Sequence, residues 1–165
     1  MEKWDIYNSK KEKTGKQVFR GDKLNDNEFH LVINAWIVND KNQFLITQRA
    51  PNKSYSLMWE CTGGSALAGE NGLQACIREI KEELNLDVDK NNVNLIGSAL
   101  RYFKGCPDIL EVYIFKSNAK IEDIKIQEDE VNDVMWASKD EILKLYNDKK
   151  FEASLFFMNA LCYYD

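Results

Sequence analysis

The sequence predicts an α+β fold, built as an α/β/α sandwich in a single domain spanning residues 1–165. This length is close to that of one ordinary domain, about 150 residues. Most of the chain consists of short runs rich in β-branched and aromatic residues, and only three stretches show helical periodicity. Strands with a few intercalated helices are typical of a sheet covered by helices.

The first third of the chain predicts a short strand, a polar arm and a hairpin. Residues 1–28 are expected to form an N-terminal strand and polar arm, because only residues 4–7 alternate apolar and polar side chains. Residues 30–38 are rich in β-branched and aromatic types. The turn cluster NDKN separates them from residues 43–48, which read as the returning strand of a hairpin.

The remaining chain predicts one amphipathic helix, further strands and two C-terminal helices. The helix covers residues 72–84. Strands are expected at 93–103, 109–115 and 131–136. Ser138 and Glu141 form a capping box that opens the next helix. Residues 151–163 are apolar at helical spacing and are expected to pack on the sheet.

Composition and charge exclude several classes of function. The net charge is −5, so no basic field attracts a nucleic acid polymer. No uncharged run approaches the roughly 20 residues that span a membrane, and we expect no membrane association. The four cysteines form no CxxC pair and there is one histidine, which argues against a zinc site and favours a reduced, cytoplasmic protein. Any metal is expected to be bound by oxygen.

Three carboxylates share one face of the predicted helix. At about 100° per residue, Glu79, Glu82 and Glu83 fall within an arc of roughly 100°, opposite the apolar stripe. Arg78 lies one turn before Glu82, where an ion pair can form. Like charges on one face repel each other unless a cation lies between them, and Mg²⁺ commonly binds a few carboxylates together with substrate phosphates. A solvated acidic face is the alternative reading of these residues alone.

The spacing around this helix resembles the Nudix box. The segment GSALAGENGLQACIREIKEELNL, residues 64–86, follows the pattern G-x5-E-x7-R-E-U-x-E-E-x-G-U, where U is apolar. It departs at one defined position, Asn85, where the family has Gly. Asn is the next most frequent residue in the left-handed conformation that ends a helix, so we expect no loss of activity there. The flanking sequence resembles the branch of the family closest to isopentenyl-diphosphate isomerase.

This resemblance implies a Nudix fold, a mixed sheet between helices, and a metal-dependent hydrolase. Such an enzyme cleaves a diphosphate linkage in a nucleoside diphosphate-type substrate by water attack on phosphorus, with Mg²⁺ or Mn²⁺. Carried onto matching positions, the metal ligands are Glu79, Glu82 and Glu83. Arg78 orients these carboxylates, and Glu70 is either an outer ligand or an anchor of the loop.

Further candidates lie outside the helix. Glu130 precedes a Trp-containing strand and is our candidate general base beside the box residues, with a solvated loop charge as the alternative. Arg49 and Lys53 have the spacing of two diphosphate-binding residues in the isomerase, and both side chains suit phosphate, with solvated surface charges as the alternative. Gly64 lets the backbone approach the metal or phosphate closely. We also expect a small-molecule diphosphate as the partner, and a homodimer through the polar arm stays open.

Two other functions compete with hydrolysis. The isomerase needs a catalytic cysteine and a histidine-rich metal site, but its cysteine position falls on Gly63 and a metal-binding histidine position falls on Ser65. Cys61 lies two residues away, His30 matches another isomerase histidine, and Glu111 matches one of the isomerase acids. A catalytically silent binding module is the second alternative, although the box glutamates are all present. The physiological substrate is not predicted.

Overall fold

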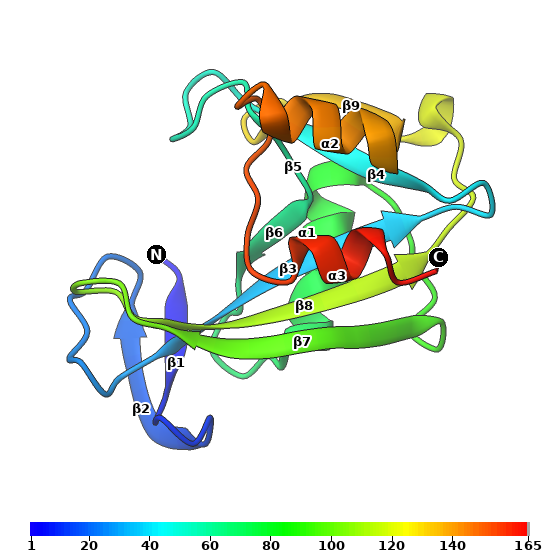
Figure 1. Cartoon of the computed structure of the whole chain (residues 1–165). Coiled ribbons are helices and arrows are strands. Elements are labelled where there is room, and N and C mark those ends of the chain that lie inside the picture. The colour runs from blue at the N-terminus through cyan, green and yellow to red at the C-terminus, as the bar shows by residue number, and fades with distance from the viewer. Residues whose placement is uncertain (165) are drawn as a thin grey trace.

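The computed structural model describes residues 1–164 and consists of a mixed sheet, a separate hairpin and helices on both faces of the sheet (Figure 1). The strands are β1 (Lys3–Tyr7), β2 (Lys13–Phe19), β3 (His30–Val38), β4 (Gln43–Arg49), β5 (Trp59–Glu60), β6 (Thr62–Ser65), β7 (Val93–Arg101), β8 (Asp108–Lys116) and β9 (Val131–Ser138). The helices are α1 (Gly72–Leu84), the 3-10 turn η1 (Ile121–Asp123), α2 (Lys139–Asn147) and α3 (Phe157–Leu161).

The large sheet has the strand order β5-β4-β3-β8-β7, with β6 pairing to β3 and β9 pairing to β4. Strand β3 runs parallel to β8 and antiparallel to β4 and β6, so the sheet is mixed. The predicted hairpin of β3 and β4 is confirmed, and its strands join at Asn39–Asn42. The two short strands β5 and β6 pair with β4 and β3, and β6 contacts α1 and leads into the box segment.

Alternating side chains of β3 point to two separate apolar cores. Ile33 and Ile37 pack in one cluster with the buried face of α1, which includes Ile80. Trp36 and Val38 pack in the other cluster with residues of α2 and α3. Because the sheet buries both faces, its strands are apolar on both sides rather than on one. The predicted α/β/α sandwich is therefore confirmed.

Helix α1 has the bounds that the sequence predicts, because both of its ends are coded locally. The Asn71 side chain accepts from the Gln74 backbone N–H, and the Gln74 side chain accepts from the Asn71 N–H, which completes a capping box. Asn85 ends the helix with φ 50° and ψ 29°, the left-handed conformation expected of it. The capping box of Ser138 and Glu141 on α2 is confirmed as well.

Three predictions about elements are wrong. The polar arm within residues 1–28 contains β2, which pairs antiparallel with β1 although its side chains are almost all exposed. Backbone pairing, rather than apolar alternation, makes this segment a strand. The predicted strand 93–103 ends at Arg101. The C-terminal helix is restricted to α3, because Phe156 has φ 64° and Phe151 instead bridges to Trp59 of β5.

Candidate active site

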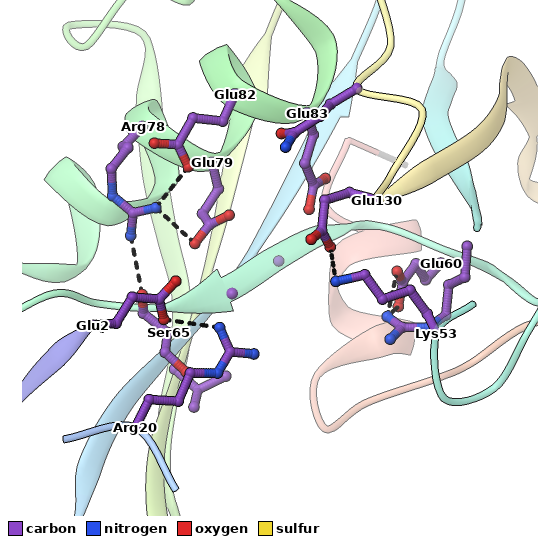
Figure 2. A pocket seen from close by; sticks show the side chains of 15 residues that line it. Glu2, Arg20, Lys53, Glu60, Ser65, Arg78, Glu79, Glu82, Glu83 and Glu130 are labelled. Atoms are coloured by element: carbon purple, nitrogen blue, oxygen red, sulfur yellow. Dashed lines mark hydrogen bonds and ion pairs between the residues drawn. The ribbon is translucent and has the colours of Figure 1, made fainter. Parts of the chain in front are cut away.

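A cavity of about 350 Å³ gathers the box residues and the other candidate site residues on one side of the sheet. Its walls come from α1, from the β5–β6 segment, from the loops that contain Lys53 and Glu130, and from the ends of the N-terminal hairpin (Figure 2). Most of the residues that the sequence singles out for this site line it, and Glu70 does not. Those that line it are Arg49, Lys53, Gly64, Arg78, Glu79, Glu82, Glu83 and Glu130. Segments far apart in the sequence thus form one polar site.

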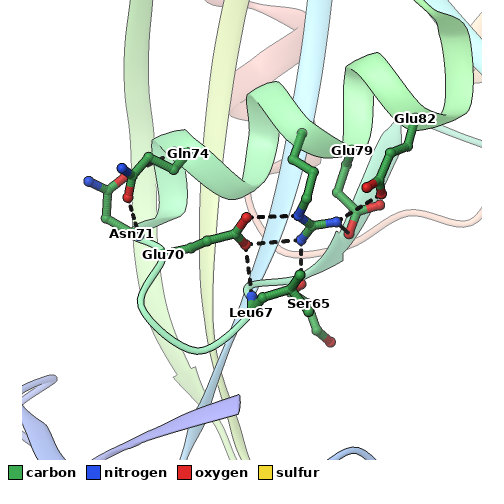
Figure 3. Close-up of polar contacts among 8 residues, drawn as sticks. Ser65, Leu67, Glu70, Asn71, Gln74, Glu79 and Glu82 are labelled. Carbon is green, nitrogen blue, oxygen red and sulfur yellow. Dashed lines mark hydrogen bonds and ion pairs between the residues drawn. The ribbon is translucent and has the colours of Figure 1, made fainter. Parts of the chain in front are cut away.

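Arg78 is the centre of the hydrogen-bond network beneath this cavity (Figure 3). Its Nε and Nη2 donate to the two carboxylate oxygens of Glu70 at 2.8 and 3.1 Å, and Nη2 also donates to the Ser65 carbonyl at 3.0 Å. Its Nη1 donates to Glu79 at 2.9 Å and to Glu82 at 3.0 Å. One guanidinium therefore ties the loop before α1 to two carboxylates of the helix, which fixes their relative positions.

Glu70 anchors the loop that precedes α1. Besides binding Arg78, its carboxylate accepts from the Leu67 N–H at 2.8 Å. These hydrogen bonds hold the pKa of Glu70 below its usual value, although burial acts in the opposite direction. Glu70 was predicted to be either an outer metal ligand or an anchor of the loop, and these contacts are those of an anchor.

Glu79 lies directly over the backbone of β6. A Cβ atom placed on Gly64 would come within 2.2 Å of the Glu79 Oε1, so any larger residue there would displace the carboxylate. The Glu79 side chain is only 16% exposed. Burial raises its pKa to about 6, against the opposing effect of Arg78 and with a further rise from Glu82. This site therefore holds a carboxylate whose charge is poorly compensated by the protein.

Glu83 is the most enclosed of the three carboxylates. Burial raises its pKa well above the usual value, and the charges of Glu79 and Glu60 raise it further, whereas a hydrogen bond with Thr62 lowers it. The loop after η1 fixes this end of α1, since the Gln127 N–H donates to the Glu83 carbonyl at 2.9 Å. Burying like charges together is costly unless a cation compensates them.

The donor set fits a hard divalent cation. All three side chains offer carboxylate oxygens, which Mg²⁺ and Mn²⁺ prefer. Between residues 1 and 164, no three acidic, histidine or cysteine side chains already converge in a metal-ligand arrangement, because Arg78 holds two of the carboxylates. Of the two carboxylates that Arg78 holds, Glu82 is the more exposed, at 52% against 16% for Glu79.

The wall opposite the helix carries two cation–carboxylate pairs. The Arg49 Nη1 contacts both oxygens of Glu60 at 2.7 and 2.9 Å, and its Nε donates to the Ser54 carbonyl at 2.6 Å. Lys53 forms an ion pair with Glu130 across the gap between their loops. Burial raises the pKa of Glu60, although Arg49 opposes this.

Three charged residues of the cavity were not predicted from the sequence: Glu2, Arg20 and Glu60. Glu60 directly follows the apolar patch at 57–59, and its two-residue strand pairs with β4, which places it against Arg49. Glu2 and Arg20 reach the cavity from the hairpin of β1 and β2. No local pattern marks them, because their position depends on how the hairpin packs.

The residues that suggested isomerase chemistry lie elsewhere. His30 is buried and stacks on Trp4 with ring centroids 4.1 Å apart, and it does not line the cavity. Cys61 is 5% exposed in the core on the side of α2 and α3, where burial raises the pKa of its thiol well above the usual value. Glu111 accepts a hydrogen bond from the Tyr113 hydroxyl at 2.7 Å and lines a different pocket.

Comparison with known proteins matches residues 28–157 to the NUDIX domain model. The chain belongs to the Nudix family. An uncharacterised Nudix hydrolase from Listeria monocytogenes is 35% identical over 164 residues, covering 98% of this chain and 94% of the relative. A Nudix hydrolase from Deinococcus radiodurans is 30% identical over 120 residues, covering 72% of this chain and 70% of the relative. With such relatives the chain is a Nudix hydrolase, in a family of generally metal-dependent pyrophosphohydrolases acting on small molecules.

More distant similarities include a solved structure with the same fold and an isomerase. A crystal structure from Deinococcus radiodurans superposes with a TM-score of 0.76 at 22% identity, covering 99% of this chain and 100% of the other. The isopentenyl-diphosphate isomerase of Shigella boydii is 27% identical over 126 residues, covering 72% of this chain and 66% of the isomerase. Separately, none of the helices within residues 1–164 has the length and apolar character needed to cross a membrane.

Proposed function

We propose that this Nudix protein hydrolyses a diphosphate linkage in a nucleoside diphosphate-type small molecule, by water attack on phosphorus. The observation that carries the proposal is that one cavity is lined both by the acidic face of α1 and by the basic side chains of Arg49 and Lys53. A carboxylate face suits a divalent cation, and the opposing basic side chains suit phosphate oxygens. A protein with a net charge of −5 needs such a local arrangement to bind a polyanion.

The residues divide this work between them. Glu79, Glu82 and Glu83 hold Mg²⁺ or Mn²⁺, which when bound would neutralise the diphosphate and lower the pKa of the attacking water. Arg78 positions two of these carboxylates and the loop before them. The Gly64 backbone leaves room for Glu79 and for substrate oxygens. These roles rest on the contacts described above.

Substrate binding and proton removal are assigned to Arg49, Lys53 and Glu130, on the wall opposite α1. Arg49 presents its planar guanidinium from the end of β4, where Glu60 holds it in a fixed orientation. Lys53 contributes a point charge to the diphosphate. As Lys53 turns to the substrate, the carboxylate of Glu130 is released and accepts a proton from the attacking water. The ion pair between these residues couples substrate binding to exposure of the base.

Isomerisation of an alkene diphosphate is less well supported by the geometry. The isomerase-like relatives are similar in sequence, yet the Cys61 thiol is buried in the core that contains α2 and α3 and does not line the cavity. His30 is fixed against Trp4 and the Pro107 carbonyl. A catalytically silent binding module would have the same cavity, so only a measurement of turnover distinguishes it from an enzyme.

A panel of diphosphate compounds tests the proposal directly. The panel holds nucleotide sugars, dinucleoside polyphosphates, nucleoside di- and triphosphates and isopentenyl diphosphate, each incubated with Mg²⁺, Mn²⁺ or EDTA. We expect release of phosphate or nucleotide from one class, and no release with EDTA. Silence across the hydrolysis panel would support the binding module, and conversion of isopentenyl diphosphate to its isomer would overturn the hydrolase.

A further inference from the structure

The N-terminal hairpin contributes a cation to the active-site cavity. Arg20 follows β2 and lines the cavity together with Glu2, which precedes β1. Figure 2 shows this pair beside Ser65, on the other side of the cavity from Lys53 and Glu60. Both residues lie before residue 28, where the match to the family model begins. The basic side chains therefore flank the carboxylate face on two sides.

The hairpin is fastened to the loop that leads into the box helix. The Ala68 N–H donates to the Lys3 carbonyl at 2.8 Å, and the Gly69 N–H donates to the Asp5 carboxylate at 2.8 Å. The Lys13 Nζ also donates to the Glu70 carbonyl at 3.3 Å. Because strand and loop are joined by these three contacts, the end of β2 has a defined place relative to Glu79 and Gly64.

Arg20 is the most open of the cavity's cationic side chains. Its side chain is 61% exposed, against 21% for Arg78, 23% for Arg49 and 29% for Lys53. Within residues 1–164 its ion pair is with Glu2, through Nη1 at 2.8 Å, and Glu2 is itself 46% exposed. Such surface pairs contribute about 0–1 kcal/mol, so an anionic ligand can replace Glu2.

The other cations are already committed to the site. Arg78 is held by three carboxylates, and Arg49 is neutralised by both oxygens of Glu60. Lys53 and Arg49 stand together on one wall and serve the same diphosphate in the proposed function. The Arg20 guanidinium on the opposite side contacts Glu2 through Nη1 and is more exposed than the other cations, so it suits a further anionic group; guanidinium geometry matches phosphate oxygens.

We infer that Arg20 binds a phosphate group additional to the diphosphate, so that the preferred substrate carries at least three phosphate groups or their equivalent. This inference rests on the proposed function, because it assumes that the diphosphate lies between the box carboxylates and Arg49. Arg20 is then a specificity-determining residue. Its loss raises KM for the longer substrates and leaves kcat nearly unchanged, as expected for an interaction present in both ground and transition states.

The test compares two base-free probes that cannot be cleaved. Methylenediphosphonate carries two anionic groups and its bis-methylene triphosphonate homologue carries three. Calorimetric titrations in Mg²⁺ use the wild-type chain, Arg20→Gln, Arg20→Lys and Lys23→Gln. Lys23 is a matched control, since it lies three residues from Arg20 and does not line the cavity.

We expect Arg20→Gln to weaken the triphosphonate by about tenfold, the size of one charge-assisted contact, and the diphosphonate by less than about twofold. Arg20→Lys should recover part of the loss, and Lys23→Gln should bind both probes as the wild type does. Equal losses for both probes, or no loss for either, would overturn the inference while leaving the hydrolase standing. If the wild type bound neither probe in Mg²⁺, the proposed function would fail, and the inference with it.

Discussion

Glu83→Gln is expected to lower kcat by at least about 100-fold and to weaken activation by Mg²⁺. Changes to groups that merely support a metal ligand cost about 10–100-fold, so loss of a direct ligand should reach or exceed that range. The substitution keeps the shape of the side chain and removes one buried negative charge. Initial rates measured across a Mg²⁺ titration would give both quantities.

The same substitution should not destabilise the folded chain. Burial raises the pKa of Glu83, as do the nearby charges of Glu79 and Glu60, so a neutral amide relieves an unfavourable interaction. We expect an unchanged or higher Tm in metal-free buffer. Glu128→Gln, which removes an exposed acid outside the cavity, is the matched control. Activity of Glu83→Gln within a few-fold of wild type would contradict the metal assignment.

Arg78→Lys is expected to lower kcat by about 10–100-fold although the positive charge is kept. A lysine ammonium cannot reproduce the planar fork that reaches Glu70, Glu79 and the Ser65 carbonyl together. The box loop and the first carboxylate would then lose their common support. The concentration of Mg²⁺ needed for half-maximal rate should also rise.

Arg101→Lys provides a control of matched chemistry and burial. Arg101 contacts both oxygens of Asp108 at 2.6 and 2.9 Å and is 19% exposed, close to the 21% of Arg78, but it lies outside the cavity. We expect it to lower Tm and to leave the activity per folded molecule unchanged. If both variants lost activity only in proportion to unfolding, Arg78 would have a structural role and no positioning role.

Local sequence signals predicted the box helix with its correct bounds. Its apolar stripe and the left-handed Asn85 were predicted from neighbouring residues, and the Asn71 cap is also local although the sequence prediction did not use it. The hairpin of β3 and β4 was predicted for the same reason. By contrast, β2 carries a polar, exposed sequence, and only its pairing with β1 makes it a strand. Its pairing with β1 leaves no apolar periodicity in a strand whose side chains are almost all exposed.

In the candidate site, too, the arrangement within one element was predictable from the sequence, whereas contacts between elements were not. Arg78 and the three glutamates share one helix, so their common face follows from helical geometry alone. Glu130 and Lys53 were candidates from their types and spacing, but their ion pair depends on two loops meeting. Arg20 and Glu2 were missed because they reach the cavity through the packing of a separate hairpin. Helical geometry therefore predicts how the residues of α1 lie together, and the family resemblance adds Arg49, Lys53 and Glu130. Packing supplies their contacts and the hairpin residues.

The most direct test of water attack on phosphorus is isotopic. The substrate found with the panel would be hydrolysed in the presence of Mg²⁺ in water enriched in ¹⁸O, and the products would be analysed by mass spectrometry. We expect one ¹⁸O atom per cleaved bond in a phosphate-containing product, and no consumption of substrate with EDTA. Substrate consumed without ¹⁸O in any phosphate product would contradict hydrolysis at phosphorus.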